Sequence, residues 1–110
     1  MMNEQSIPVY DAKLFSWDHA SRTASIEASD LRGLGISTLA QFFSRVYDDA
    51  CDVGFGLRSG VTGKTVYFIL DYQIEAESAR GIACWEFRVA QESANRHPSL
   101  KDWTVVIFND

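Results

Sequence analysis

The sequence predicts an α+β fold that is mainly β: an antiparallel meander sheet of five to six strands, with one or two short helices packed on one face. Val53, Phe55 and Leu57 alternate with glycine and arginine, which is the period of a strand with one buried face. Residues 65–70 form a nearly unbroken apolar run, and residues 83–89 alternate again. Turn-like segments separate the three runs, so we expect them to pair as successive antiparallel strands.

The N-terminal part predicts a tail followed by a hairpin. Residues 1–10 are expected to form a loose tail, because Pro8 blocks regular helix there. Residues 13–17 and 23–28 both alternate, and the short polar stretch between them is typical of a turn. Ser29 then suits the start of a single helical turn.

Residues 38–50 allow two interpretations. An apolar stripe at helical spacing and a capping box at their start favour a helix from about 38 to 47. Asp48 and Asp49 would lie at the C-terminus of that helix, where negative charge opposes the helix dipole. The alternative is an irregular loop that leads into the strand beginning at Val53.

The C-terminal part predicts a surface connection and a last strand. Residues 91–102 are polar and contain Pro98, whereas residues 103–108 are apolar on both faces. A strand with two apolar faces is typical of a covered, central position in a sheet. No linker or repeat interrupts the chain, so residues 1–110 are expected to form a single domain.

Composition and charge narrow the function classes. Of the 110 residues, 46% are hydrophobic and 13% aromatic, enough for a core without metal or disulfide support. The net charge is −5 and basic residues are scattered singly, so direct nucleic-acid binding and an anionic membrane surface are disfavoured. The first residues lack the pattern of a signal peptide, and no run reaches membrane-spanning length. We therefore expect a cytoplasmic protein.

The titratable residues do not form a recognisable catalytic or metal motif. Cys51 and Cys84 match no zinc spacing, and we expect two reduced thiols, with a disulfide between them as the alternative if the strands align them. His19 and His97 each lie in a predicted turn or loop, without metal-ligand spacing. We accordingly predict no catalytic residue, no metal and no cofactor.

Two sets of residues are the predicted interaction sites. Asp48, Asp49 and Asp52 form an acidic segment that suits a basic groove on a target, a weak cation site, or simply a solvated loop. Tyr67 and Tyr72 are five residues apart in one predicted strand and should therefore lie on opposite faces. One of those faces must pack under a helix or meet another molecule.

The sequence thus favours a small non-catalytic interaction module. It would act through a protein partner or by self-association, with a symmetric homodimer as the simplest form and an acidic inhibitor or adaptor as a more specific one. The alternative is a small enzyme or ligand-binding domain with a pocket between sheet and helix. The polar groups that this alternative offers are His19, His97, Asp52, Arg58 and Tyr72.

Overall fold

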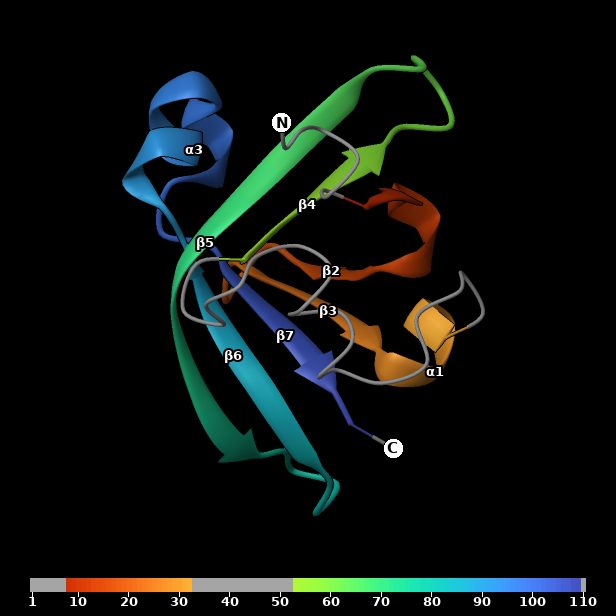
Figure 1. Cartoon of the computed structure of the whole chain (residues 1–110), viewed down its shortest axis with the longest axis vertical. Helices are drawn as coiled ribbons and strands as arrows, with labels where there is room; N and C mark the ends of the chain where they lie inside the picture. Colours follow the sequence, from red (N-terminus) through yellow and green to blue (C-terminus); the bar gives the residue numbers. More distant parts are fainter. Residues whose placement is uncertain (1–7, 33–52, 110) are drawn as a thin grey trace, which may run out of the picture.

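A computed structural model describes residues 8–32 and 53–109, and these residues form one mixed, strongly curved sheet of seven strands (Figure 1). The strands are β1 (Val9–Asp11), β2 (Ser16–Asp18), β3 (Thr23–Glu27), β4 (Val53–Arg58), β5 (Thr65–Glu77), β6 (Ala83–Val89) and β7 (Thr104–Phe108). The helical elements are η2 (Ala12–Leu14), α1 (Ala28–Arg32), α3 (Gln91–Arg96) and η3 (Pro98–Leu100). The mainly β character of the α+β prediction is confirmed.

The strand order is β1-β4-β5-β6-β7-β3-β2. Strands β4 to β7 follow one another as the predicted antiparallel meander. The prediction of a purely antiparallel sheet of five to six strands is wrong, however, because β1 pairs parallel to β4 and β3 pairs parallel to β7. Alternation identifies a strand and its buried face, but it carries no information on which distant strand lies beside it or in which direction.

The two edge strands of the sheet, β1 and β2, are joined by only four residues, 12–15. In a flat sheet of this order the edges would lie about 29 Å apart. The chain from Asp11 to Ser16 spans at most about 17 Å. The sheet must therefore curl into a half-barrel that brings its two edges toward each other.

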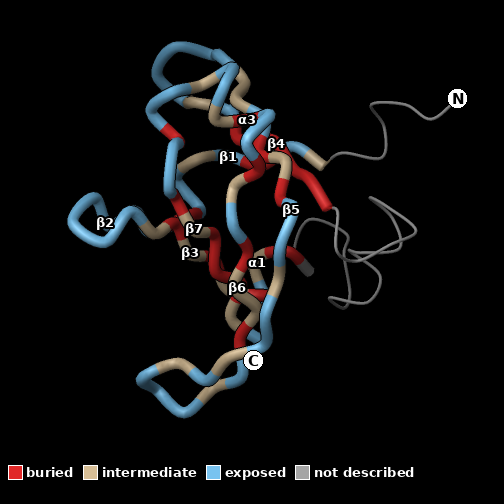
Figure 2. The backbone as a smooth tube through the Cα atoms, turned by 90° about the vertical axis from the view of Figure 1, so that its left-hand side faces the viewer, coloured by how far each residue is buried: buried red, intermediate tan, exposed pale blue. Residues whose placement is uncertain are grey.

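Aromatic side chains fill the concave side of this half-barrel. Phe15, from the short connection, stacks on Phe55 of β4 with ring centroids 5.6 Å apart. Trp17 of β2 approaches Phe68 of β5 at 6.4 Å. The edge strand β2 and the connection before it thus share one core with β4 and β5 from the other half of the sheet, and Figure 2 shows the buried positions gathered in the interior.

Strand β5 contains an irregularity that changes the faces of its side chains. Leu70 pairs with Val89 and Tyr72 pairs with Arg88, so Asp71 is an extra residue with no counterpart on β6. This β-bulge reverses the alternation beyond it. Tyr67 and Tyr72 therefore lie on the same face of the sheet, the outer one, and the prediction of opposite faces is wrong.

Along the first half of β5, where β6 does not pair with it, helix α3 and the residue before it contact the β5 backbone. The buried hydroxyl Oγ of Ser93 accepts a hydrogen bond from the Ile69 amide at 2.7 Å and donates one to the Tyr67 carbonyl at 3.4 Å. The Ala90 amide donates to the Ile69 carbonyl at 2.6 Å. These contacts satisfy backbone groups of β5 where its ladder with β6 has ended.

Several local predictions are refined. The turn before β3, the single helical turn of α1 and the central position of β7 are confirmed. Tyr10, assigned to the tail, is buried in β1, and the start of residues 13–17 is a 3-10 turn rather than a strand. The expected helix at 38–47 lies outside the described residues.

Ser93→Ala should destabilise the protein by about 1–3 kcal/mol, because the Ile69 amide would lose its partner in a partly buried position. Chemical denaturation measures this change in the free energy of unfolding. The matched control is Ser99→Ala, an exposed serine, which should change stability by less than about 0.5 kcal/mol. Equal effects of the two substitutions would contradict the role assigned to Ser93.

Deleting Asp71 should be tolerated, with a loss of no more than about 1 kcal/mol. Leu70 would then adjoin Tyr72 opposite the consecutive residues Val89 and Arg88, so the ladder becomes regular and every side chain keeps its face. Denaturation of the purified deletion variant tests this expectation.

Deleting Arg88 is the control, because β6 pairs in register with both β5 and β7. The deletion would turn Phe87 or its neighbours away from the core, at a cost of about 3 kcal/mol or more. A deletion of Asp71 that proves as damaging as this one would show that the bulge is required for folding.

Candidate functional site

Two features of the described residues are candidates for function. One is an apolar group on the outer face of β5, and the other is a pocket at the start of β3 and β7. The predicted acidic segment Asp48, Asp49 and Asp52 lies outside the described residues, as does Cys51. Of the predicted interaction residues, the structure places Tyr67 and Tyr72.

The β5 outer face, as we name it, consists of Tyr67, Tyr72 and Ile74. These side chains are 42%, 52% and 42% exposed. They lie on one side of the sheet because the bulge at Asp71 corrects the odd spacing between the tyrosines. Figure 2 shows exposed positions along much of β5. The sequence named both tyrosines as candidates for an exposed surface, but it did not name Ile74.

Tyr67 also has a structural role. Its ring covers Gly56 of β4, where an added Cβ would lie only 2.9 Å from the ring carbons Cδ1 and Cε1. The absence of a side chain at Gly56 thus makes room for the tyrosine. Tyr72 pairs across the strand with Arg88, whereas Ile74 pairs with Glu86. Packing against the rest of the chain therefore explains the exposed apolar side chains of Tyr72 and Ile74 less well than that of Tyr67.

The outer side of β7 is covered differently. The guanidinium of Arg80, from the turn between β5 and β6, lies 4.4 Å from the centre of the Phe108 ring and forms an ion pair with Glu27 at 2.9 Å. Cys84 pairs with Phe108 and carries a buried, free thiol. The chain thus shields this part of its outer side, in contrast to the β5 outer face.

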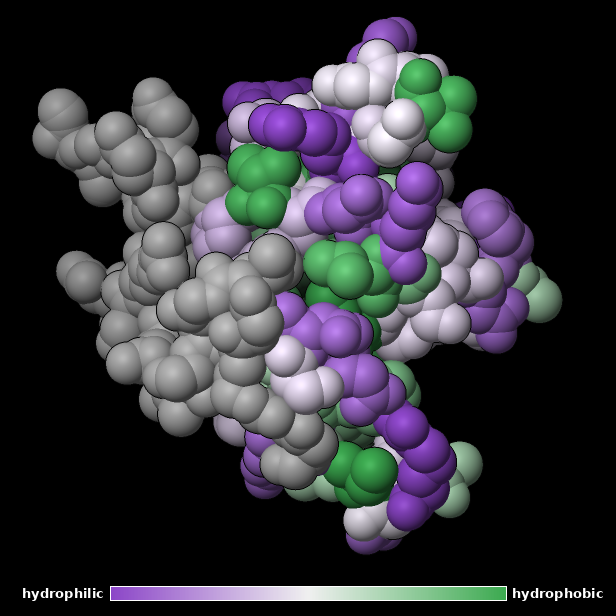
Figure 3. All heavy atoms as spheres, turned by 90° about the vertical axis from the view of Figure 1, so that its right-hand side faces the viewer, coloured by the Kyte–Doolittle hydropathy of each residue, from purple (hydrophilic) through white to green (hydrophobic). Residues whose placement is uncertain are grey.

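Other exposed apolar residues are more isolated. Val61, 92% exposed, lies in the turn between β4 and β5. Figure 3 shows separate hydrophobic areas divided by hydrophilic residues on another side of the molecule. Single exposed apolar residues are common in soluble proteins and require no functional explanation.

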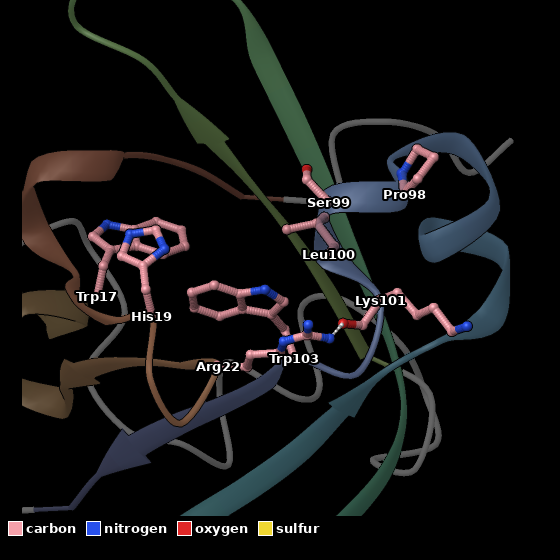
Figure 4. Close-up of a pocket in the computed structure, with 8 residues that line it drawn as sticks. All are labelled: Trp17, His19, Arg22, Pro98, Ser99, Leu100, Lys101 and Trp103. Carbon is pink, nitrogen blue, oxygen red and sulfur yellow. Dashed lines mark hydrogen bonds between the residues drawn. The ribbon is translucent and has the colours of Figure 1, made fainter.

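The second feature, the Trp103 pocket, has a volume of about 400 Å³. Its walls come from the turn before β3 and from the segment before β7, and the lining residues are Trp17, His19, Arg22, Pro98, Ser99, Leu100, Lys101 and Trp103 (Figure 4). Strands β3 and β7 run parallel, so the segments that precede them meet at the same end of the sheet. This parallel pairing creates the pocket.

The aromatic rings of the pocket contact one another edge to face. The Trp103 ring centre lies 5.6 Å from that of Trp17 and 5.4 Å from that of His19. The Trp17 indole Nε1–H donates to the Ala12 carbonyl at 3.1 Å, which fixes its orientation. In Figure 4, Trp17 and His19 stand on one side, Leu100 and Ser99 on the other, and Trp103 between them.

The turn between β2 and β3 is held by polar contacts. Asp18 Oδ1 accepts hydrogen bonds from the Ala20 and Ser21 amides at 3.0 and 3.4 Å. Hydrogen bonding to Ser21, through its hydroxyl first and its amide second, lowers the pKa of the Asp18 carboxyl below its ordinary value. The carboxylate is therefore ionised at neutral pH and caps the turn that carries His19.

Two non-glycine residues with positive φ lie at this end of the sheet. Arg22 has φ 53° and Asp102 has φ 66°, a conformation that costs energy for side chains other than glycine. The Thr104 amide donates to the Arg22 carbonyl at 2.9 Å. Arg22 Nη1 donates to the Lys101 carbonyl at 3.3 Å and lies 3.6 Å from Asp102 Oδ2.

Asp52 lies outside the described residues, and the other four polar residues of the enzyme alternative are not brought into the Trp103 pocket together. His19 lines the Trp103 pocket, whereas His97 lines a separate apolar hollow of about 160 Å³. Arg58 ends β4, and Tyr72 lies on the β5 outer face. Within residues 8–32 and 53–109, no three histidine, cysteine or acidic side chains gather as metal ligands.

Sequence reasoning missed the pocket itself. The pattern of the chain does not single out Trp17, Arg22 or Trp103 as a group. The left-handed backbone of Arg22 and the parallel pairing of β3 with β7 leave no readable pattern in the chain. The one signal in the sequence that pointed to this region was the polar turn before Thr23, and that turn indicated only a hairpin.

Comparison of the chain with models of known protein families, with curated proteins and with solved structures finds no match. Among the described helices, none is both long enough and apolar enough to span a bilayer. The fold and the two candidate sites must therefore be interpreted from their own geometry.

Cys84 should be alkylated slowly in the folded protein. Burial, and to a lesser degree the charge of Glu86, raises the pKa of its thiol, and the thiolate is the reactive form. In a Cys51→Ser background, iodoacetamide at pH 8 should modify native Cys84 at least about tenfold more slowly than the thiol of the denatured chain. Mass spectrometry of timed samples gives both rates. Equal rates would show that the strands around Cys84 open readily.

Proposed function

We propose that this protein is a non-catalytic interaction module that binds another protein chain through the β5 outer face. The observation that supports this proposal most directly is the bulge at Asp71. It places Tyr72 and Ile74 beside each other on the outside of the sheet, together with Tyr67. Large apolar side chains grouped on one exposed face are typical of protein contact surfaces.

The partner that this face fits best is a second copy of the same chain. Arg88 flanks Tyr72, and Glu86 flanks Ile74, so charges of both signs border the apolar group. Two copies related by a two-fold axis can bring Arg88 of one copy toward Glu86 of the other. The surface is thus complementary to itself both in its apolar centre and in its polar border.

Tyr72→Glu should weaken self-association at least about tenfold, because a buried carboxylate would lie in the apolar centre of the interface. Sedimentation velocity over concentrations up to about 200 µM measures the dimer dissociation constant. The matched control is Val61→Glu, which adds the same charge at an exposed position away from this face. It should leave self-association unchanged.

A charge exchange tests the border of the interface. Arg88→Glu alone should weaken the dimer, and adding Glu86→Arg should restore it, because the exchanged pair again has opposite charges. A wild-type chain that stays monomeric throughout the concentration range would overturn the proposal of self-association. A dimer that Asp48, Asp49 and Asp52 to Asn substitutions disrupt, but Tyr72→Glu does not, would move the interface to the acidic segment.

A further inference from the structure

We infer that the Trp103 pocket binds a small, planar aromatic molecule that carries an anionic group. This site is separate from the β5 outer face and does not depend on the proposed interaction. The inference rests on the shape of the pocket, on the charge of its lining residues and on the way in which its walls are held.

The size and the walls of the pocket suit a ring. A volume of about 400 Å³ lies in the range of sites for small organic ligands. Trp17 and His19 provide aromatic surfaces on one side, Leu100 provides an apolar surface on the other, and Trp103, 7% exposed, lies between them (Figure 4). Aromatic side chains bind planar molecules by stacking or by edge-to-face contact.

The charge of the lining residues favours an anion. The ionisable residues that line the pocket are His19, Arg22 and Lys101, all of them basic types, although the Lys101 side chain extends away from the rings and its carbonyl faces Arg22 (Figure 4). The nearby carboxylates are already engaged, Asp18 with turn amides and Asp102 with Arg22. Arg22 is therefore the cation that an anionic group would meet in this pocket, and a fixed cation attracts anions.

Arg22 is the group that would bind the anion. Its contacts with the Lys101 carbonyl and with Asp102 both use Nη1. Within the described part of the chain, no contact occupies Nη2 or Nε, and these donors form a fork that matches carboxylate and phosphate oxygens. Its side chain is 56% exposed and therefore accessible to a ligand.

The walls are positioned before any ligand arrives. The hydrogen bond from Trp17 to Ala12 and the cap at Asp18 hold one wall, and the bond between Thr104 and the Arg22 carbonyl holds the base. Arg22 keeps its energetically costly positive φ between these hydrogen-bonded walls. Backbone strain at a pocket is frequently associated with binding, because it fixes a side chain where a ligand requires it.

The wild-type protein can be tested with three probes: adenosine monophosphate, which has ring and anion, adenosine, which has the ring alone, and ribose 5-phosphate, which has the anion alone. The indole Nε1–H signals of the three tryptophans report binding by two-dimensional NMR. The monophosphate should shift the signals of Trp17 and Trp103 but not that of Trp85, which lies on β6 and lines none of these pockets. It should bind at least about fivefold more tightly than either fragment.

Arg22→Gln should reduce the affinity for the monophosphate at least about fivefold and leave adenosine binding unchanged. The matched control is Arg96→Gln, which removes an exposed arginine that pairs with Glu92 on α3, and it should have no effect. Unchanged indole spectra in the absence of ligand verify that each variant is folded. If Arg22→Gln does not fold, the comparison of the three probes on the wild-type protein remains decisive.

Three results would overturn the inference. If adenosine binds as tightly as the monophosphate, the anionic group does not contribute to binding. If ribose 5-phosphate binds as tightly, the aromatic ring does not contribute. If the indole signals of Trp17 and Trp103 do not shift with any probe, the Trp103 pocket is not the binding site. A short single-stranded oligoadenylate that binds much more tightly than the monophosphate would replace the small molecule with a nucleic acid.

Discussion

The two edges of the sheet, β1 and β2, are consecutive in the chain and separated by only four residues, and much of the structure follows from this constraint. A connection of that length cannot cross a flat seven-stranded sheet, so the sheet curls. The connection then lies over the concave side, where Phe15 packs on Phe55 and Trp17 approaches Phe68. One aromatic core therefore joins both ends of the sheet, with little need for a separate covering layer there.

Strand β5 changes its pairing partner along its length. Its first half pairs with β4 and its second half with β6, and the bulge at Asp71 lies where the change occurs. Ser93 and Ala90 bind the β5 backbone where β6 has ended. A bulge both bends a strand and re-aims its side chains. The bulge at the change of neighbours thus also sets the face on which Tyr72 and Ile74 lie.

The Trp103 pocket results from the parallel pairing of β3 with β7. This pairing sets the turn that carries His19 and Arg22 beside the segment that ends in Trp103. An antiparallel arrangement would have placed those segments at opposite ends of the strands. The two candidate sites therefore depend on two separate departures from a simple meander, and a change at one need not disturb the other.

The sequence by itself determined most of the strands, though not β1, because alternation and β-branched runs depend on local burial, as at Val53, Phe55 and Leu57. It also identified Tyr67 and Tyr72 as exposed candidates. Only the tertiary structure decided that they share a face, since an extra residue such as Asp71 has no local signature. It likewise decided that Arg22 and Trp103 meet, because pairing between distant strands depends on how the whole sheet closes, and periodicity within one segment does not record it.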